Sequence, residues 1–330
     1  MASLEQVFSE IAAVTRRHRN QTVTSSIVEH NAILSQLKEE GSIKSDVSGG
    51  TEIQYPVALT ENATIQNYAG WDTLNPGQSD SVRPARYGWA QKSIHVSASG
   101  SELRQNSGKE AMVRLVKMRQ DIAEQTAANR MAIELYGDGS AYESINGLGN
   151  FLTADGTGTV GGIDSSTYTN WKSQFYEMTG NNAWSKSTIE GYMAVLYKKC
   201  VVGNDRPNLI MASHDVFTAI EEAIIDKSRY YNGGGGYMDS KKAHSNFDSI
   251  IFRSNVPVVY DSNTNFSETA ELAYFINTKH MELKEHPQAK WEFEEPRKPV
   301  NADGVIIPSY WMGQFCCKQR RTSGRLLDAA

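Results

Sequence analysis

The sequence predicts an α+β protein with a long projecting hairpin, and three observations support this prediction. Apolar and polar residues alternate over residues 51–59, a helical pattern spans residues 108–136, and short helices and strands alternate beyond residue 187. The 330 residues are 39% hydrophobic and 22% charged, which is typical of globular proteins and excludes the disordered and fibrous classes. A formal net charge of −5 argues against a dedicated nucleic-acid binder.

Residues 1–50 are predicted to form an arm that has no core of its own. Apolar residues at helical spacing cover residues 3–15, and a second, shorter apolar pattern lies in residues 25–38. The basic run RRHR at residues 16–19 is typical of a solvated turn, with contact to a polyanion as the alternative.

A strand with one apolar face begins after this arm. Ile53, Tyr55, Val57 and Leu59 alternate with polar residues, and Pro56 within the run indicates an edge strand. The same period of two returns at Ile94, Val96 and Ala98, with a turn region at residues 75–84 between the two runs. The simplest interpretation is one long hairpin over residues 51–98.

Aromatic rings lie at both ends of residues 68–89, a run too rich in Gly, Pro, Ser and charge to build a core. The rings belong to Tyr68, Trp71, Tyr87 and Trp89. About 24 residues a side extend roughly 50 Å after twist is allowed for, whereas a globule of this size has a radius of gyration of about 20 Å. We therefore expect another molecule to cover these rings, with a loop folded back over its own domain as the alternative.

A long helix follows the hairpin. Ser107 and Glu110 have the form of a capping box, and residues 108–136 would span roughly 43 Å at about 1.5 Å a residue. Its apolar face is predicted to consist of Leu115, Met118, Ile122, Thr126 and Ile133.

Residues 140–276 are predicted to form a mixed domain. Helices are expected near residues 189–200 and 215–225, and strands at residues 208–212, 249–261 and 272–276. The glycine-rich segment at residues 229–244 is interpreted as a mobile loop, and further strands are expected after residue 277, including residues 305–319.

No pattern in the chain indicates catalysis, a cofactor or a metal. Gly156, Gly158 and Gly161 satisfy GxGxxG, but a dinucleotide site needs a helix directly afterwards and turn residues follow here. The seven histidines form no HxxxH or HExxH pair, and Cys200, Cys316 and Cys317 are expected to be buried, reduced thiols. Neither a signal peptide nor a transmembrane stretch is evident, so we expect synthesis in the cytoplasm and no membrane partner.

The order of these elements resembles the major capsid protein of tailed bacteriophages, which has the Hong Kong 97-like capsid fold. The resemblance runs in order over nearly the whole chain. Five stretches carry it: NAILSQL at residues 31–37, GGTEIQYPVAL at 49–59, INGLGN with GGIDSSTYTNW at 145–171, FINTKHMELKEHP at 275–287 and GQFCCKQRRTSGRL at 313–326.

The resemblance implies a non-enzymatic shell subunit with five segments. These are an N-terminal arm (1–50), an extended loop (51–98), a P-domain spine helix (99–139), an A-domain (140–276) and P-domain return strands (277–330). Subunits would form hexamers and pentamers of an icosahedral head around double-stranded DNA, with which they make non-specific contact. The loop would lie on a neighbouring subunit and contact it through Tyr68, Trp71, Arg83, Arg86, Tyr87 and Trp89.

The resemblance also implies partners and a location. A short arm leaves no room for a built-in scaffold, so we expect a separate scaffolding protein, a portal and possible decoration proteins, with assembly in the host cytoplasm and a final place in the virion capsid. Lys92 is the only lysine between residues 51 and 103, so we do not expect the lysine cross-links of some members. One alternative is an encapsulin-like nanocompartment shell, because encapsulins resemble the same fold. The other two are a soluble nucleotide-binding enzyme with a long lid and a virion or adhesion component that oligomerises by strand exchange.

Overall fold

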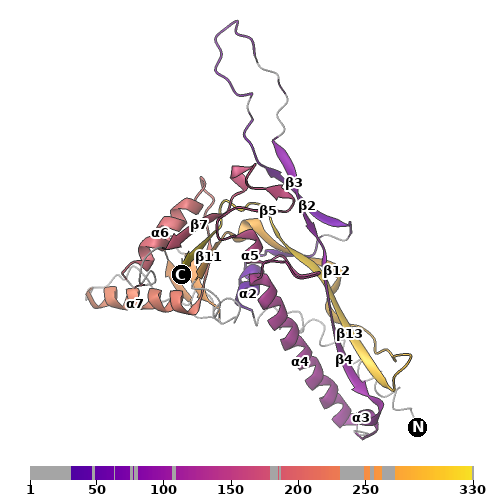
Figure 1. Cartoon of the computed structure of the whole chain (residues 1–330). Coiled ribbons are helices and arrows are strands. Elements are labelled where there is room, and N and C mark those ends of the chain that lie inside the picture. The colour runs from indigo at the N-terminus through magenta and orange to yellow at the C-terminus, as the bar shows by residue number, and fades with distance from the viewer. Residues whose placement is uncertain are drawn as a thin grey trace. The chain divides into compact units, whose positions relative to one another are not determined.

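The computed structural model shows two compact units, each with its own sheet (Figure 1). Unit 1 comprises Met1–Gly50, Trp89–Gly147 and Glu282–Phe315, and unit 2 comprises Thr51–Gly88, Leu148–Met281 and Cys316–Ala330. The described residues are 31–46, 49–62, 64–74, 77, 81–105, 109–178, 185, 187–230, 249–252, 256–261 and 272–328. The pattern at residues 3–15, the RRHR run, Ser107 and residues 231–244 of the glycine-rich segment lie outside them.

Unit 1 is built on a four-stranded sheet in the order β1-β12-β13-β4. The strands are β1 (Ile43–Lys44), β4 (Ala90–Ser99), β12 (Met281–Phe293) and β13 (Gly304–Cys317). Helix α2 (Ala32–Glu39) precedes the sheet, and its cap residue Asn31 accepts a 3.1 Å hydrogen bond from the Ile33 amide. Four apolar residues of α2 are buried, so this part of the arm packs into unit 1: Ala32, Ile33, Leu34 and Leu37.

The pairing of β4 differs from the predicted hairpin. Ile94, Val96 and Ala98 pair with β13, in a register that runs from Gly304 opposite Ser99 to Gly313 opposite Ala90. The alternation of residues 90–99 correctly indicated a strand, but a period of two says which side chains share a face and not which strand lies alongside. The 14-residue β13 offers this segment a longer antiparallel partner than residues 53–59 do.

The long helix appears as predicted, as α4 (Lys109–Tyr136) after the short α3 (Gly100–Gln105). Figure 1 shows α4 beside β4. Arg119 of α4 donates hydrogen bonds to the Ser97 carbonyl of β4 and to the Glu102 carboxylate of α3. The predicted apolar face is wrong at Met118 and Ile122, which are more than half exposed, and at Thr126, which is also exposed. The face on the sheet instead carries small residues, Ala123, Ala127 and Ala128 among them, which let the helix backbone approach closely.

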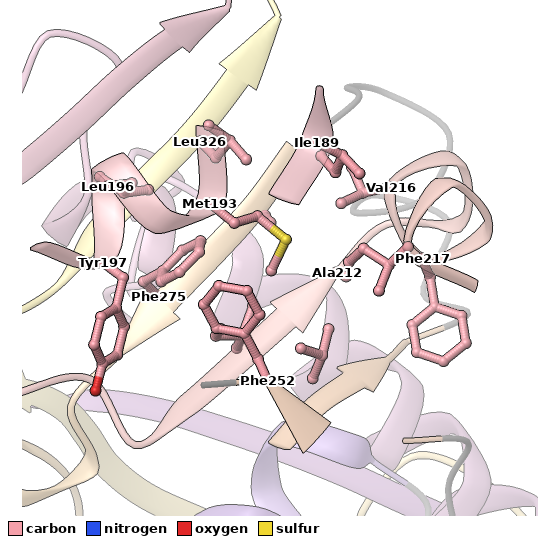
Figure 2. Packing of buried hydrophobic residues seen from close by; sticks show 14 of the residues in the cluster. Ile189, Met193, Leu196, Tyr197, Ala212, Val216, Phe217, Phe252, Phe275 and Leu326 are labelled. Carbon is pink, nitrogen blue, oxygen red and sulfur yellow. The ribbon is translucent and has the colours of Figure 1, made fainter. Parts of the chain in front are cut away.

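Unit 2 contains a six-stranded mixed sheet in the order β7-β14-β11-β8-β10-β9. Its strands are β7 (Gln174–Met178), β8 (Leu209–Ala212), β9 (Ser249–Phe252), β10 (Val256–Tyr260), β11 (Leu272–Ile276) and β14 (Gly324–Asp328). Helices α6 (Ile189–Cys200) and α7 (His214–Tyr230) pack on this sheet. Figure 2 shows this core, to which Met193 of α6, Val216 of α7 and Phe275 of β11 contribute side chains.

The predicted helices and strands of residues 189–276 are thus confirmed, but the C-terminal end is not grouped as expected. Residues 277–330 were predicted to return to the P-domain as a whole. Strand β14 instead pairs with β7 and β11 in unit 2. The remaining short elements of unit 2 are α5 (Leu148–Phe151), β5 (Thr159–Val160), β6 (Ile163–Asp164), and the 3-10 helices η1 (Thr169–Trp171) and η3 (Thr278–His280).

Candidate functional site: the β2–β3 hairpin and its loop

Strands β2 (Glu52–Ala58) and β3 (Val82–Gly88) form the hairpin on which the candidate interface is built. Ile53 lies opposite Tyr87, and Tyr55 lies opposite Ala85. In β2 every second residue is buried or half-buried while the intervening ones are exposed. In β3 Ala85 and Tyr87 are buried and the other residues are exposed. One face of the hairpin therefore packs on unit 2, and the other face is free to meet solvent or another molecule.

Tyr87 anchors the hairpin to its own unit. Its ring is buried and makes edge-to-face contacts with Tyr55 and Phe151, at centroid distances of 6.4 and 6.0 Å. Its hydroxyl donates a 2.6 Å hydrogen bond to the Cys317 carbonyl. Burial raises the pKa of this phenol well above its ordinary value, so the hydroxyl remains a donor.

Gly161 completes the anchor from the turn between β5 and β6. It has a φ of +61°, and a Cβ at this position would lie 3.1 Å from the Ala85 Cβ and 3.2 Å from the Tyr87 ring. Its carbonyl accepts a 2.9 Å hydrogen bond from the Arg86 amide. The glycine is required here both for the left-handed backbone and for the close approach of β3.

The loop beyond the hairpin is closed by contacts of its own. The Leu59 amide donates to the Ser81 carbonyl at 2.9 Å, and Gln66 reaches the Thr73 carbonyl at 3.2 Å. At the centre is a turn in which the Asp72 amide donates to the Ala69 carbonyl at 3.0 Å. The Asp72 carboxylate in turn accepts from the Ala69 amide at 2.7 Å. These bonds give the loop a local shape, while residues 65–74 all remain exposed.

Four large apolar side chains of this loop are uncovered. Trp71 is fully exposed, and the exposed fractions of Ile65, Tyr68 and Leu74 are 90%, 66% and 56%. Single exposed apolar residues are ordinary, but four within ten residues make this loop a candidate contact surface. Ile65 and Leu74 were not predicted as contact residues from the sequence, because isolated apolar residues in a turn-rich run form no periodic pattern.

The two predicted arginines lie on the hairpin itself. Arg83 and Arg86 are both exposed on β3. The Arg83 guanidinium stacks 5.2 Å from the centre of the Tyr168 ring, which fixes it on unit 2.

Trp89 lies in unit 1 and not in the hairpin. It is half-buried, its indole N–H donates a 3.0 Å hydrogen bond to the Gly50 carbonyl, and its ring meets His286 edge to face at 6.0 Å. Of the six predicted contact residues, the structure thus presents Tyr68, Trp71, Arg83 and Arg86 at the surface. Tyr87 is covered by its own unit and Trp89 is partly covered.

The described residues provide little for catalysis. The GxGxxG glycines form the turns around β5 and β6, and the element that follows is the three-residue η1, not a helix that opens on the glycines. No cluster of three or more potential metal ligands occurs among the described residues. The three cysteines are free and buried, and burial raises the pKa of Cys317 to about 12, so its thiolate is scarce at neutral pH. No helix in the described part of the chain is long and apolar enough to span a membrane.

Comparison with known proteins finds similarity in structure alone. No protein-family model matches the chain, and no curated protein matches its sequence. Among solved structures, the capsid asymmetric unit of cyanophage A-1(L) matches with a TM-score of 0.60 and 12% identity, covering 87% of this chain and 90% of that chain. A structure of Mycobacterium phage Bobi matches with a TM-score of 0.55 and 9% identity, covering 88% and 90%.

The capsid of Myoviridae phage XM1 also matches, with a TM-score of 0.53 and 10% identity over 87% of this chain and 88% of that chain. Each match spans nearly the full length of both chains, so it concerns the whole fold and not one sheet. At such low identity the likeness is one of fold. The chain therefore has the α+β fold of these phage capsid structures, the Hong Kong 97-like capsid fold, which confirms the fold class predicted from the sequence.

Proposed function

We propose that the chain is a major capsid protein of a tailed phage, which self-assembles into hexamers and pentamers of an icosahedral head around double-stranded DNA. The fold supports this proposal, because the solved structures that share it include the capsids of cyanophage A-1(L) and phage XM1. Shared fold alone does not specify function, so a feature of this chain has to support the role as well.

That feature is the loop between β2 and β3. Its base is fixed by Tyr87 and Gly161, whereas Ile65, Tyr68, Trp71 and Leu74 are all uncovered. A tethered loop that exposes apolar side chains gains stability once a second molecule covers them. In a shell of identical subunits the covering molecule is a neighbouring copy, which the exposed side chains of Arg83 and Arg86 on β3 also contact.

Helix α4 offers a second apolar surface in unit 1. Met118 and Ile122 lie one helical turn apart and are both more than half exposed. We expect this surface to be covered in the assembled head. Two separate uncovered surfaces fit a subunit that meets more than one neighbour, whereas a soluble enzyme would gain nothing from either of them.

The proposal includes the segments and partners that the capsid role implies. The segments are the N-terminal arm (1–50), the extended loop (51–98), the spine helix (99–139), the A-domain (140–276) and the P-domain return strands (277–330). Within these bounds β4 pairs in the sheet of unit 1 and β14 in the sheet of unit 2. A separate scaffolding protein, a portal and decoration proteins are the expected partners besides the chain itself and its DNA. Assembly takes place in the host cytoplasm, and the final location is the virion capsid. We infer neither enzymatic activity nor a cofactor.

The test is assembly of the purified full-length chain, with and without co-expressed scaffolding protein, followed by light scattering and negative-stain microscopy. Closed particles or rings of five and six subunits are the expected result. A chain that stays monomeric over the whole concentration range with scaffold present would overturn the proposal. Closed shells that contain protein and never DNA would support an encapsulin-like compartment, and open tubes a non-shell component. Thermal stabilisation by nucleotides that Gly158→Val abolishes would support the enzyme.

A further inference from the structure

Unit 2 contains a pocket of about 410 Å³, and three of the four charged residues that line it are cations. We call it the Lys172–Arg321 pocket. Lys172 follows η1, Lys199 lies in the last turn of α6, and Arg321 lies just before β14. Three different segments thus bring a positive charge to one cavity, although the chain as a whole has a formal net charge of −5. This concentration of cations is a local feature and not a reflection of composition.

None of these three cations has an ion-pair partner in the described part of the chain. The only carboxylate in the pocket lining is that of Asp155. It accepts hydrogen bonds from the Thr157 hydroxyl and, at 3.0 Å, from the Thr157 amide, and these bonds lower the pKa of Asp155. Three cations and one carboxylate leave a net charge of two positive units around the cavity.

Arg321 is held on the pocket wall by a chain of hydrogen bonds. Its Nη1 donates to the Asn170 Oδ1 at 2.9 Å, and the Asn170 Nδ2 donates to the Leu59 carbonyl at 2.9 Å. Only one of the five guanidinium N–H groups is used in this way, so the others remain as donors. Lys199 is similarly placed, with its ammonium 3.3 Å from the Phe175 carbonyl and 5.0 Å from the centre of the Tyr176 ring. Both cations are positioned before any ligand arrives.

A fourth cation lies behind the wall. Arg320 is fully buried, donates to the Phe151 carbonyl at 2.7 Å, and lies 3.5 Å from the hydroxyl of Ser173, which lines the pocket. Its Nη1 has no hydrogen-bond partner. A buried guanidinium is surrounded by low dielectric, so its charge is poorly screened and adds to the positive potential of the cavity.

We propose that the Lys172–Arg321 pocket binds a phosphate group, either of a small phosphate ligand or of a nucleic-acid backbone. A guanidinium fork, two ammonium groups and the hydroxyl of Ser173 are the donors that phosphate oxygens accept from. The pocket lining has a net charge of two positive units. The charge of a phosphate group, about −1.5 to −2, balances it more closely than the single negative charge of a carboxylate does. The cavity volume is large enough for a phosphate together with part of a sugar.

The donors of this site are side chains, not the backbone of the adjacent glycine turn. The Gly156 amide donates to the Thr153 carbonyl at 3.2 Å, and the Thr157 amide donates to Asp155. These amides are therefore already used and cannot form a phosphate cradle. The site is thus separate from the GxGxxG interpretation, and it does not depend on the capsid role.

The test is titration of the full-length chain with inorganic phosphate and with a short DNA duplex at low salt, followed by calorimetry. Each ligand is measured on the unmodified chain and on Lys199→Gln, Arg321→Gln and the matched control Lys198→Gln, whose exposed lysine is next along α6 but does not line the pocket. We expect the phosphate Kd to rise about tenfold in Lys199→Gln and Arg321→Gln, since each loses a charge-assisted bond, and to stay within about twofold in Lys198→Gln. Arg321→Lys, which keeps the charge and loses the fork, should give an intermediate rise.

The two ligands distinguish the source of the phosphate. If the duplex competes with inorganic phosphate and the same variants weaken binding of the duplex, the backbone of a nucleic acid is the source of the phosphate group. If only inorganic phosphate binds, the source is a small ligand. The proposal is overturned if phosphate does not bind, if acetate binds as tightly, or if Lys198→Gln weakens binding as much as Lys199→Gln does. Unchanged melting temperatures of the variants would show that they remain folded.

Discussion

The substitution Trp71→Ala provides the sharpest separation between assembly and folding. The ring is fully exposed in the isolated chain and has no hydrogen bond in the described structure. Replacing an exposed side chain that packs on nothing changes the free energy of unfolding by no more than about 0.5 kcal/mol. We therefore expect the dissociated Trp71→Ala subunit to unfold at the same urea concentration as the unmodified subunit.

The effect on assembly follows from the area of the ring. An indole offers about 200 Å² of surface, so a neighbour that covers one face removes roughly 100 Å² from water. At about 25 cal/mol per Å² this contributes about 2.5 kcal/mol to each contact, or roughly sixtyfold in the association constant. Light scattering should show that the concentration at which particles form rises steeply in Trp71→Ala. In the proposed shell each capsomer would make several such contacts, so the loss would be multiplied across the shell.

Two further variants make the result interpretable. Tyr142→Ala removes an aromatic side chain that is 93% exposed but lies outside the loop, so assembly should be unaffected. Tyr87→Ala removes a buried ring and should lower the free energy of unfolding by about 3–5 kcal/mol before any assembly is measured. The reasoning would be refuted if Trp71→Ala assembled normally, or if it destabilised the subunit as Tyr87→Ala does.

Three other outcomes are expected within single units. Gly161→Ala should destabilise the hairpin base by about 1–3 kcal/mol, because it combines a left-handed backbone with a Cβ crowded by Ala85 and Tyr87, and urea unfolding measures this. Burial raises the pKa of Glu285 above its ordinary value of 4.5, so its contribution to stability is present below pH 4.5 and is lost as the pH rises through its folded pKa. Glu285→Gln should therefore raise the melting temperature at neutral pH and leave it unchanged below pH 4.5, which melting curves over a pH series would show. The buried Cys317 should resist iodoacetamide in the native chain and react after unfolding, with equal rates in both states as the contradicting result.

Elements with a strong local pattern were predictable from the sequence. Helix α4 begins and ends within a residue or two of its prediction, and strand β8 is the buried run predicted at residues 208–212. Both depend on periodicity within one segment, which is a local property of the chain. The order of these elements was sufficient to predict the capsid fold that the solved structures share.

Pairing between distant segments was not predictable in the same way. Residues 90–99 form a strand as expected but pair with β13, more than 200 positions away in the chain. The apolar face of α4 was predicted wrongly for a related reason. In the sequence, Met118 and Ile122 have the spacing and the side chains of core residues. The alanines on the opposite face of the helix, however, permit the closer contact with the sheet. In both cases the outcome depends on competition between partners, which no single segment encodes.

The aromatic run at residues 68–89 divides into two parts with different physical roles. Tyr87 lies opposite Ile53 within a paired strand, so its side chain is directed onto unit 2 and is covered there. Trp71 lies in a turn that bonds only to itself, so no neighbouring strand directs its side chain toward the body of the unit. Rings of similar chemistry thus stabilise the subunit at the base of the hairpin and remain available to a neighbour near its tip. An interface built in this way exposes its apolar contacts without weakening the fold that presents them.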